Sequence, residues 1–117
     1  ESASSLTVYA SPGRVQYHPG VAKVWGDWND DGTVNASRNI SSVTDTGVGD
    51  HTVNFTTSFS SANYGYNFNI DGPAFIQVRA PAAAKAAGSM QLLTVDGATA
   101  VTATDPGGWN YSAFGDQ

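Results

Sequence analysis

The residues best placed by type and spacing to do chemistry lie between Asp27 and Arg38. Asp27, Asn29 and Asp31 occupy the first, third and fifth positions of an EF-hand-type calcium loop, and Gly32 supplies its turn glycine. The twelfth position should be a bidentate glutamate, but it is Arg38, whose fixed positive charge opposes a cation. No helical pattern flanks the segment. A hairpin turn is therefore predicted, because Asn-Asp-Asp-Gly is ordinary turn chemistry, and neither a metal site nor a cofactor is predicted.

Catalysis would need a base with a partner, and only two histidines are available. His18 precedes Pro19 in a turn and His51 closes a hairpin, so both are predicted to be solvated loop residues. Every acidic residue except Glu1 is an aspartate, and most of these lie beside turn residues, where capping explains them. Neither a phosphate-binding glycine loop nor a nucleophile elbow is present. No catalytic residue is predicted, and we expect a chain that binds without catalysing.

Several aromatic side chains are candidates for stacking on sugar rings. Aromatic residues in strands belong to a core or a subunit interface more often than to a binding platform. Trp28 and Trp109 are the better exceptions because both lie next to loops.

Residues 40–59 are predicted to form a β-hairpin around which the chain is organised. Residues 45–50 contain the glycines and aspartates that allow the chain to reverse. The second arm has the two-residue period of a half-buried strand. Its predicted buried face consists of Val53, Phe55, Thr57 and Phe59, and its predicted solvent-exposed face consists of Thr52, Asn54, Thr56 and Ser58.

The same stretch carries a family resemblance. The run Asn39 to Thr57, preceded by Pro19-Gly20-Val21-Ala22-Lys23-Val24-Trp25 and followed by Ala62-Asn63-Tyr64, resembles the C-terminal domain of bacteriophage and prophage tail-fibre proteins. The closing Ala113-Phe114-Gly115-Asp116 is similar to the end of that family. The resemblance covers residues 18–71 and 111–117. It departs at residues 26–32, where the family usually has an Asn-Phe-rich turn.

The resemblance implies a receptor-binding or structural tip domain of a phage tail fibre, located on the virion and extracellular. Such a domain works as a homotrimer and recognises a bacterial surface polysaccharide or an outer-membrane protein. The receptor-contact candidates are then Trp28, Asp30, Asp31, Trp109 and Tyr111. The alternative is a free-standing carbohydrate-binding module or a small glycan-acting enzyme.

Length and composition set the remaining bounds. The 117 residues suit one domain, divided into an N-terminal strand or linker (1–17) and a β-sandwich tip domain (18–117). Five basic residues, scattered along the chain, against ten acidic ones make nucleic acid an improbable ligand. There is no cysteine, and no apolar run is long enough for membrane insertion.

The whole pattern predicts an all-β fold, an antiparallel β-sandwich of about 7–9 short strands with under about a tenth of the residues helical. Residues 82–87 are the best helix formers, but they are expected to make a single turn or loop. The strand at 21–28 is expected to be covered on both sides. The large aromatic side chains exceed what one thin sandwich is expected to hide, which favours the homotrimer. The predicted strands are 6–9, 14–17, 21–28, 34–43, 53–59, 64–70, 75–79, 90–95, 98–102 and 109–114.

Overall fold

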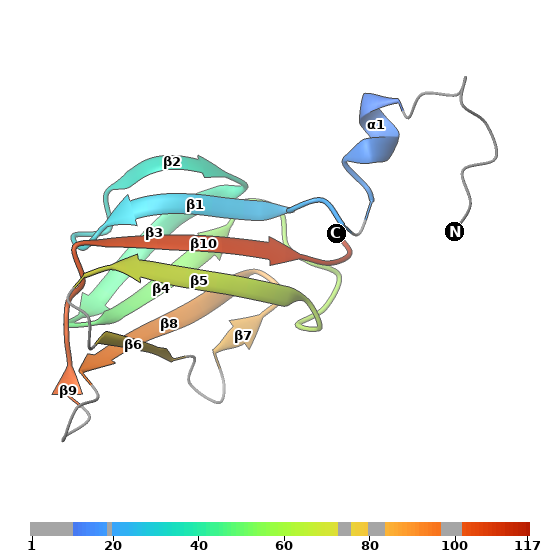
Figure 1. The fold of residues 1–117 in the computed structure, drawn as a ribbon. Coiled ribbons are helices and arrows are strands. Elements are labelled where there is room, and N and C mark those ends of the chain that lie inside the picture. The colour runs from blue at the N-terminus through green and yellow to red at the C-terminus, as the bar shows by residue number, and fades with distance from the viewer. Residues whose placement is uncertain (1–10, 19, 73–75, 80–83, 97–101) are drawn as a thin grey trace.

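A computed structural model of the chain describes residues 11–18, 20–72, 76–79, 84–96 and 102–117. These residues form one short helix and ten antiparallel strands, two of which hold only two residues (Figure 1). The elements are α1 Pro12–Val15, β1 Val24–Asn29, β2 Val34–Arg38, β3 Ile40–Gly47, β4 Asp50–Phe55, β5 Gly65–Asp71, β6 Ile76–Arg79, β7 Lys85–Ala86, β8 Ser89–Asp96, β9 Thr102–Ala103 and β10 Gly108–Phe114.

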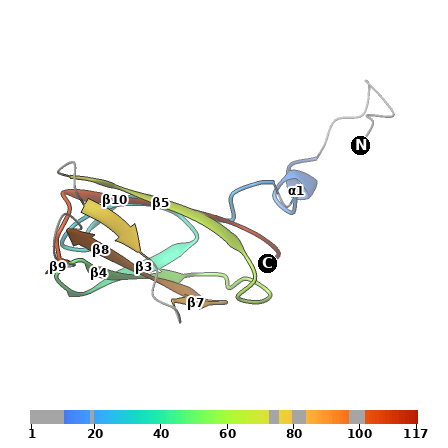
Figure 2. The same ribbon diagram turned by 60° about the horizontal axis from the view of Figure 1, so that its bottom comes forward.

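The strands make two layers that face each other (Figure 2). One sheet has the order β2-β1-β10-β5, and the other has the order β3-β4-β8-β6, with β7 and β9 also paired to β8. Every pairing is antiparallel. The predicted all-β, antiparallel, sandwich-like fold is confirmed, and so is the central hairpin, now β3 and β4. Within the described ranges no helix has the length and apolar character needed to cross a bilayer.

The core lies between the two sheets and follows the alternation of the strands. On the first sheet Trp28 pairs with Trp109, and Val24 pairs with Ala113, and all four side chains are buried. On the second sheet the inner face of β4 carries His51, Val53 and Phe55, as its alternating burial shows. The buried face predicted for Val53 and Phe55 is confirmed, although β4 ends at Phe55, before Thr57.

The expectation that one sandwich would not hide all of its large aromatic side chains holds for the described residues, because Trp25 is 41% exposed and Tyr17 is 71% exposed. The inward faces of both sheets nevertheless bury several aromatic rings. Those fully or almost fully buried are Trp28, Phe55, Phe59, Tyr64, Trp109 and Tyr111.

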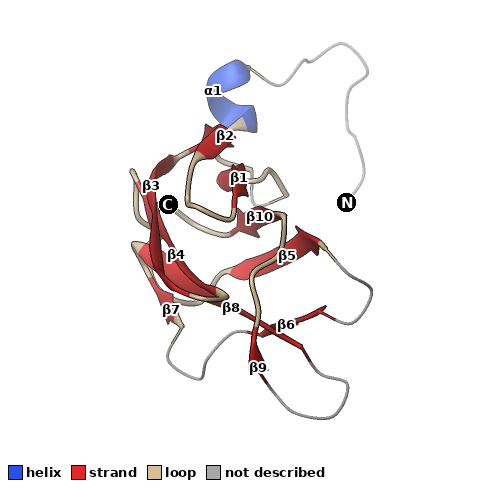
Figure 3. Cartoon of the chain, turned by 90° about the vertical axis from the view of Figure 1, so that its left-hand side faces the viewer, coloured by secondary structure: helices blue, strands red, loops and turns tan. Residues whose placement is uncertain are grey.

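Two predicted strands differ from the structure. The strand predicted at 14–17 is α1 and its following turn, because Pro12 has the fixed φ that suits a first helical position and the Ser11 carbonyl accepts from Arg14 and Val15. The extended segment predicted at 34–43 is broken at Asn39, which has a φ of 60°. The side-chain amide of Asn39 donates to the Thr57 carbonyl and accepts from the Thr57 N–H. At Asn39 the chain passes from the first sheet to the second (Figure 3).

The remaining predictions concern the second half of the chain. In place of the turn or loop predicted at 82–87, residues 85–86 form β7, a short hairpin with the start of β8. The strand predicted at 90–95 is β8, and its last residues Val95 and Asp96 pair with Ala103 and Thr102 of β9, so this pairing does not use a tight turn at residues 96–97. Residues 6–9, Phe75, residues 82–83, Gly97 and residues 98–101 lie outside the described residues.

Candidate functional site

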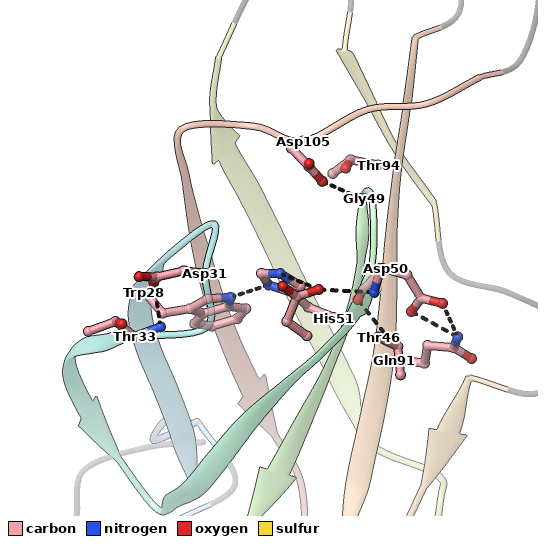
Figure 4. Close-up of polar contacts among 12 residues, drawn as sticks. Trp28, Asp31, Thr33, Thr46, Gly49, Asp50, His51, Gln91, Thr94 and Asp105 are labelled. Atoms are coloured by element: carbon pink, nitrogen blue, oxygen red, sulfur yellow. Dashed lines mark hydrogen bonds and ion pairs between the residues drawn. The ribbon is translucent and has the colours of Figure 1, made fainter.

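Two places in the fold are candidate functional sites, and the first is the end of the sandwich where three turns approach one another (Figure 4). The backbone N–H of Gly49, in the β3–β4 turn, donates to Asp105 Oδ1 in the segment before β10, at 2.5 Å. The Gly49 carbonyl accepts from the N–H of Thr94 in β8 at 2.8 Å. These bonds fix the turns rigidly against each other.

The β1–β2 connection is the predicted hairpin turn. Gly32 has a φ of 80°, and its N–H donates to the Asn29 carbonyl, while Asp31 Oδ1 accepts from the N–H of Thr33. Two of the candidate calcium ligands are occupied by another side chain, since Asn35 Nδ2 donates to Asp27 Oδ1 at 2.8 Å and to Asn29 Oδ1 at 3.0 Å. Over the described part of the chain, no three His, Cys, Asp or Glu side chains converge on a common point.

The two tryptophans proposed as contacts are in the core. Trp28 and Trp109 are both 0% exposed, and their rings are stacked with centroids 6.3 Å apart. Tyr111 is also buried. Trp28 and Trp109 were chosen because they lie next to loops in sequence, but the alternation of their strands turns both rings inward. No ring surface of Trp28 or Trp109 is open to a ligand in the folded domain.

His51 is likewise buried, at 1% exposure, so the prediction of a solvated loop residue is wrong. It lies on the inner face of β4, where its ring stacks on Trp109 at 4.5 Å and its Nδ1 accepts from Trp28 Nε1 at 2.9 Å. Because Nδ1 is an acceptor, the neutral ring carries its proton on Nε2, which faces Asp45 Oδ1 at 3.8 Å. His18, in contrast, is exposed in its turn as predicted.

The aspartates at this end have unlike environments. Burial of Asp30 and the neighbouring Asp105 raise the pKa of the Asp30 carboxyl. The indole of Trp109 acts in the opposite direction, although neither Asp30 Oδ1 nor Trp109 Nε1 reaches hydrogen-bond geometry. Hydrogen bonds from Thr33 lower the pKa of the exposed Asp31. Of the five receptor-contact candidates, only Asp31 is fully accessible and Asp30 is partly so.

The second place is the outer face of the four-stranded sheet. A shallow hollow of about 320 Å³ crosses β1, β10 and β5. The register puts Asp27, Asn110 and Asn69 in one row across the sheet. Because cross-strand neighbours share a face, these polar groups all point outward.

The next row across the same strands consists of Trp25, Ser112 and Asn67. Trp25 is 41% exposed, so the expectation that β1 is covered on both sides is wrong for the described residues. The result is a half-exposed indole at the edge of a hollow whose amides both donate and accept hydrogen bonds. We define the outer-face site by Trp25, Asp27, Asn67, Asn69, Asn110 and Ser112.

Sequence reasoning missed this site although part of its signal was visible. The alternation of Asn67 and Asn69 with Phe68 and Ile70 already placed two amides on one face of a strand. Their partners on β1 and β10 are distant in sequence, so only the sheet order reveals the row.

Comparison with known proteins adds no further constraint. A scan of protein-family models, a search of curated proteins and a search of solved structures each found no match to this chain.

Proposed function

We propose that this chain is a binding domain, the receptor-binding or structural tip domain of a phage tail fibre, and that it recognises a bacterial surface glycan through the outer-face site. The proposed setting is the virion, outside the cell, with a homotrimer as the working form. The observation that carries the glycan assignment is the half-exposed indole of Trp25 beside a row of side-chain amides.

The chemistry of the outer-face site suits a sugar. An indole face offers apolar area to the C–H face of a pyranose ring, at little entropic cost because the side chain has two rotatable bonds. The amides of Asn67, Asn69 and Asn110 match hydroxyl groups, which both donate and accept. The hollow is shallow and open, and an indole stands beside its amides, which favours a hydroxyl-rich chain with an apolar ring face over a purely apolar small molecule.

Binding is favoured over hydrolysis for a specific reason. The outer-face site contains one carboxylate, Asp27, and that group already accepts from Asn35. A glycoside hydrolase needs two carboxyl groups on either side of the scissile bond. The free-standing carbohydrate-binding module remains the second candidate, since it would use this same surface without a trimer.

The decisive experiment is Trp25→Ala, measured by calorimetry against polysaccharides isolated from bacterial surfaces. Loss of a central stacking residue is expected to weaken binding about tenfold or more. Asn69→Ala is expected to weaken it less.

Two variants serve as matched controls. Val48→Ala removes exposed apolar area in the β3–β4 turn, and Asn54→Ala removes an amide from the outer face of the other sheet. Both are expected to bind normally. Binding that is insensitive to Trp25→Ala and Asn69→Ala would contradict the proposed site.

A further inference from the structure

Next to the outer-face site, toward α1, lies a second hollow of about 440 Å³. Its lining contains two cations, Lys23 and Arg38, and no acidic residue. The other lining side chains, among them Tyr17, Asn39 and Thr57, are uncharged. In a chain with ten acidic and only five basic residues, this hollow is a local exception in charge.

Lys23 is the most unusual residue in this hollow. It is 5% exposed, and its Nζ donates to the backbone carbonyl of Gln16. Among the described residues no carboxylate lies within 4.0 Å of Lys23 or of Arg38. Buried charges in proteins are ordinarily paired with an opposite charge, because removing them from water is costly. In the described part of the chain, neither cation of this hollow therefore has a carboxylate partner.

The second hollow adjoins the outer-face site. Lys23 immediately precedes β1 and is buried, whereas Trp25 and Asp27 share the outward face of that strand. Arg38 pairs with Trp25 across β1 and β2, which places the two side chains as neighbours on that face. Trp25 lines the outer-face hollow and Arg38 lines the second hollow, so the two hollows adjoin at this pair.

We infer that Lys23 and Arg38 form an anion subsite, which binds the carboxylate or phosphate of an acidic sugar adjacent to the ring stacked on Trp25. This inference rests on the proposed function and names its ligand class as an acidic surface polysaccharide. The guanidinium of Arg38 presents a planar fork that matches either anion with two parallel hydrogen bonds. Lys23 supplies a point charge whose desolvation cost has already been met during folding.

The test is an NMR titration of the ¹⁵N-labelled chain with three probes that share one ring: glucuronate, glucose 6-phosphate and glucose. The two charged probes are expected to shift the amide signals of residues 23, 38 and 39. Glucose is expected to bind there about tenfold more weakly, as the loss of a charge-assisted hydrogen bond predicts. Whichever charged probe binds more tightly identifies carboxylate or phosphate as the natural group.

Arg38→Gln is the informative variant, because Arg38 is exposed and its replacement leaves the fold intact. It is expected to weaken glucuronate binding about tenfold and to reduce its sensitivity to salt. Lys85→Gln is the matched control, since it removes the same charge from a lysine that contacts Tyr64 and lies outside both hollows. It is expected to leave binding unchanged.

The outcomes separate this inference from the function on which it rests. Equal binding of glucuronate and glucose, or equal effects of Arg38→Gln and Lys85→Gln, overturns the anion subsite. If Trp25→Ala still abolishes polysaccharide binding in that case, the proposed function stands without the subsite. If neither Trp25→Ala nor Arg38→Gln changes binding to any surface polysaccharide, both proposals are wrong.

Discussion

Asp30 has a carboxyl oxygen that is buried and lacks a hydrogen-bond partner. A carboxylate in this position is less well solvated than in the unfolded chain, and Asp105 adds like-charge repulsion. The folded state therefore holds the proton of Asp30 more tightly than the unfolded state does. Asp31, one residue later, has the opposite behaviour because the Thr33 N–H stabilises its charge.

The first prediction concerns the pH dependence of stability at Asp30. A carboxyl whose folded pKa is raised binds more protons when folded, so its contribution to stability falls as the pH rises from its unfolded value of 3.8 through the folded pKa. Asp30→Asn removes that cost. We expect a higher thermal midpoint than wild type at pH 7 and no gain below the unfolded pKa, measured by calorimetry across the acid range.

Asp31→Asn provides the control with the opposite sign. The pKa of Asp31 is lowered in the folded state, so its stabilising contribution is present at neutral pH and is lost as the pH falls through the folded pKa. This variant is expected to lower the midpoint at pH 7. Two variants that shift the midpoint in the same direction would contradict the environments described for both residues.

His51 illustrates what the sequence conceals at the scale of single residues. Its place at the start of a hairpin arm and its polarity suggested solvent, yet the alternation with Val53 and Phe55 assigns it to the inner face. The alternation thus indicated a buried His51, but the prediction followed the polarity of the side chain instead. Trp28 and Trp109 were misjudged for the reverse reason, because closeness to a turn in sequence says nothing about which side of the sheet a ring takes.

At the scale of elements, the β3–β4 turn is constrained at one residue, Gly49. Gly49 has a φ of 65°, and a Cβ at this position would lie 2.5 Å from the Thr94 carbonyl oxygen and 2.8 Å from that of Thr104. Glycine is therefore required both by backbone conformation and by close approach.

The second prediction follows from Gly49. Gly49→Ala is expected to lower the free energy of unfolding by about 2 kcal/mol or more, because alanine is strained at positive φ and its methyl group collides with two backbone carbonyls. Urea titration followed by tryptophan fluorescence measures the loss. Gly65→Ala, where nothing lies within 4 Å of the added atom and the φ is not positive, should be close to neutral. Similar losses in the two variants would refute the steric argument.

The elements that sequence reasoning identified are those whose signal is local. The central hairpin combines strict alternation with glycines at its turn, and β5 alternates Tyr66, Phe68 and Ile70 with polar residues. Helix α1 was missed because four residues begun by a proline carry no helical periodicity. The break at Asn39 was missed because its positive φ is stabilised by Thr57, a partner eighteen residues away.

At the scale of the whole molecule, the chain has two unlike ends. Helix α1 and the C-terminus lie at one end of the sandwich, and the β1–β2 and β3–β4 turns lie at the other (Figure 1). The exposed large apolar residues near α1 are Val15 and Tyr17, and Tyr17 also lines the second hollow. We propose that trimer contacts form through Val15, which leaves the second hollow and the outer-face site open to a ligand.

The third prediction is therefore a homotrimer that depends on α1. Light scattering is expected to give three times the chain mass of 12.1 kDa. Replacing Val15 by serine should reduce the mass toward the monomer, because it removes apolar area that association would bury. Val48→Ser, at an exposed valine of the opposite end, should leave the trimer intact.

A monomer at high protein concentration would contradict the trimer. That result would favour the free-standing carbohydrate-binding module, which needs no partner copy.

The placement of the three tryptophans makes the chain its own optical sensor. Trp28 and Trp109 are sealed in the core beside His51, whereas Trp25 is half exposed at the outer-face site. An aqueous quencher such as acrylamide should therefore reach Trp25 selectively, and a bound sugar should shield it. Emission from the two sealed indoles would change only when the domain unfolds, so one spectrum, compared with that of Trp25→Phe, separates occupancy of the surface from integrity of the fold.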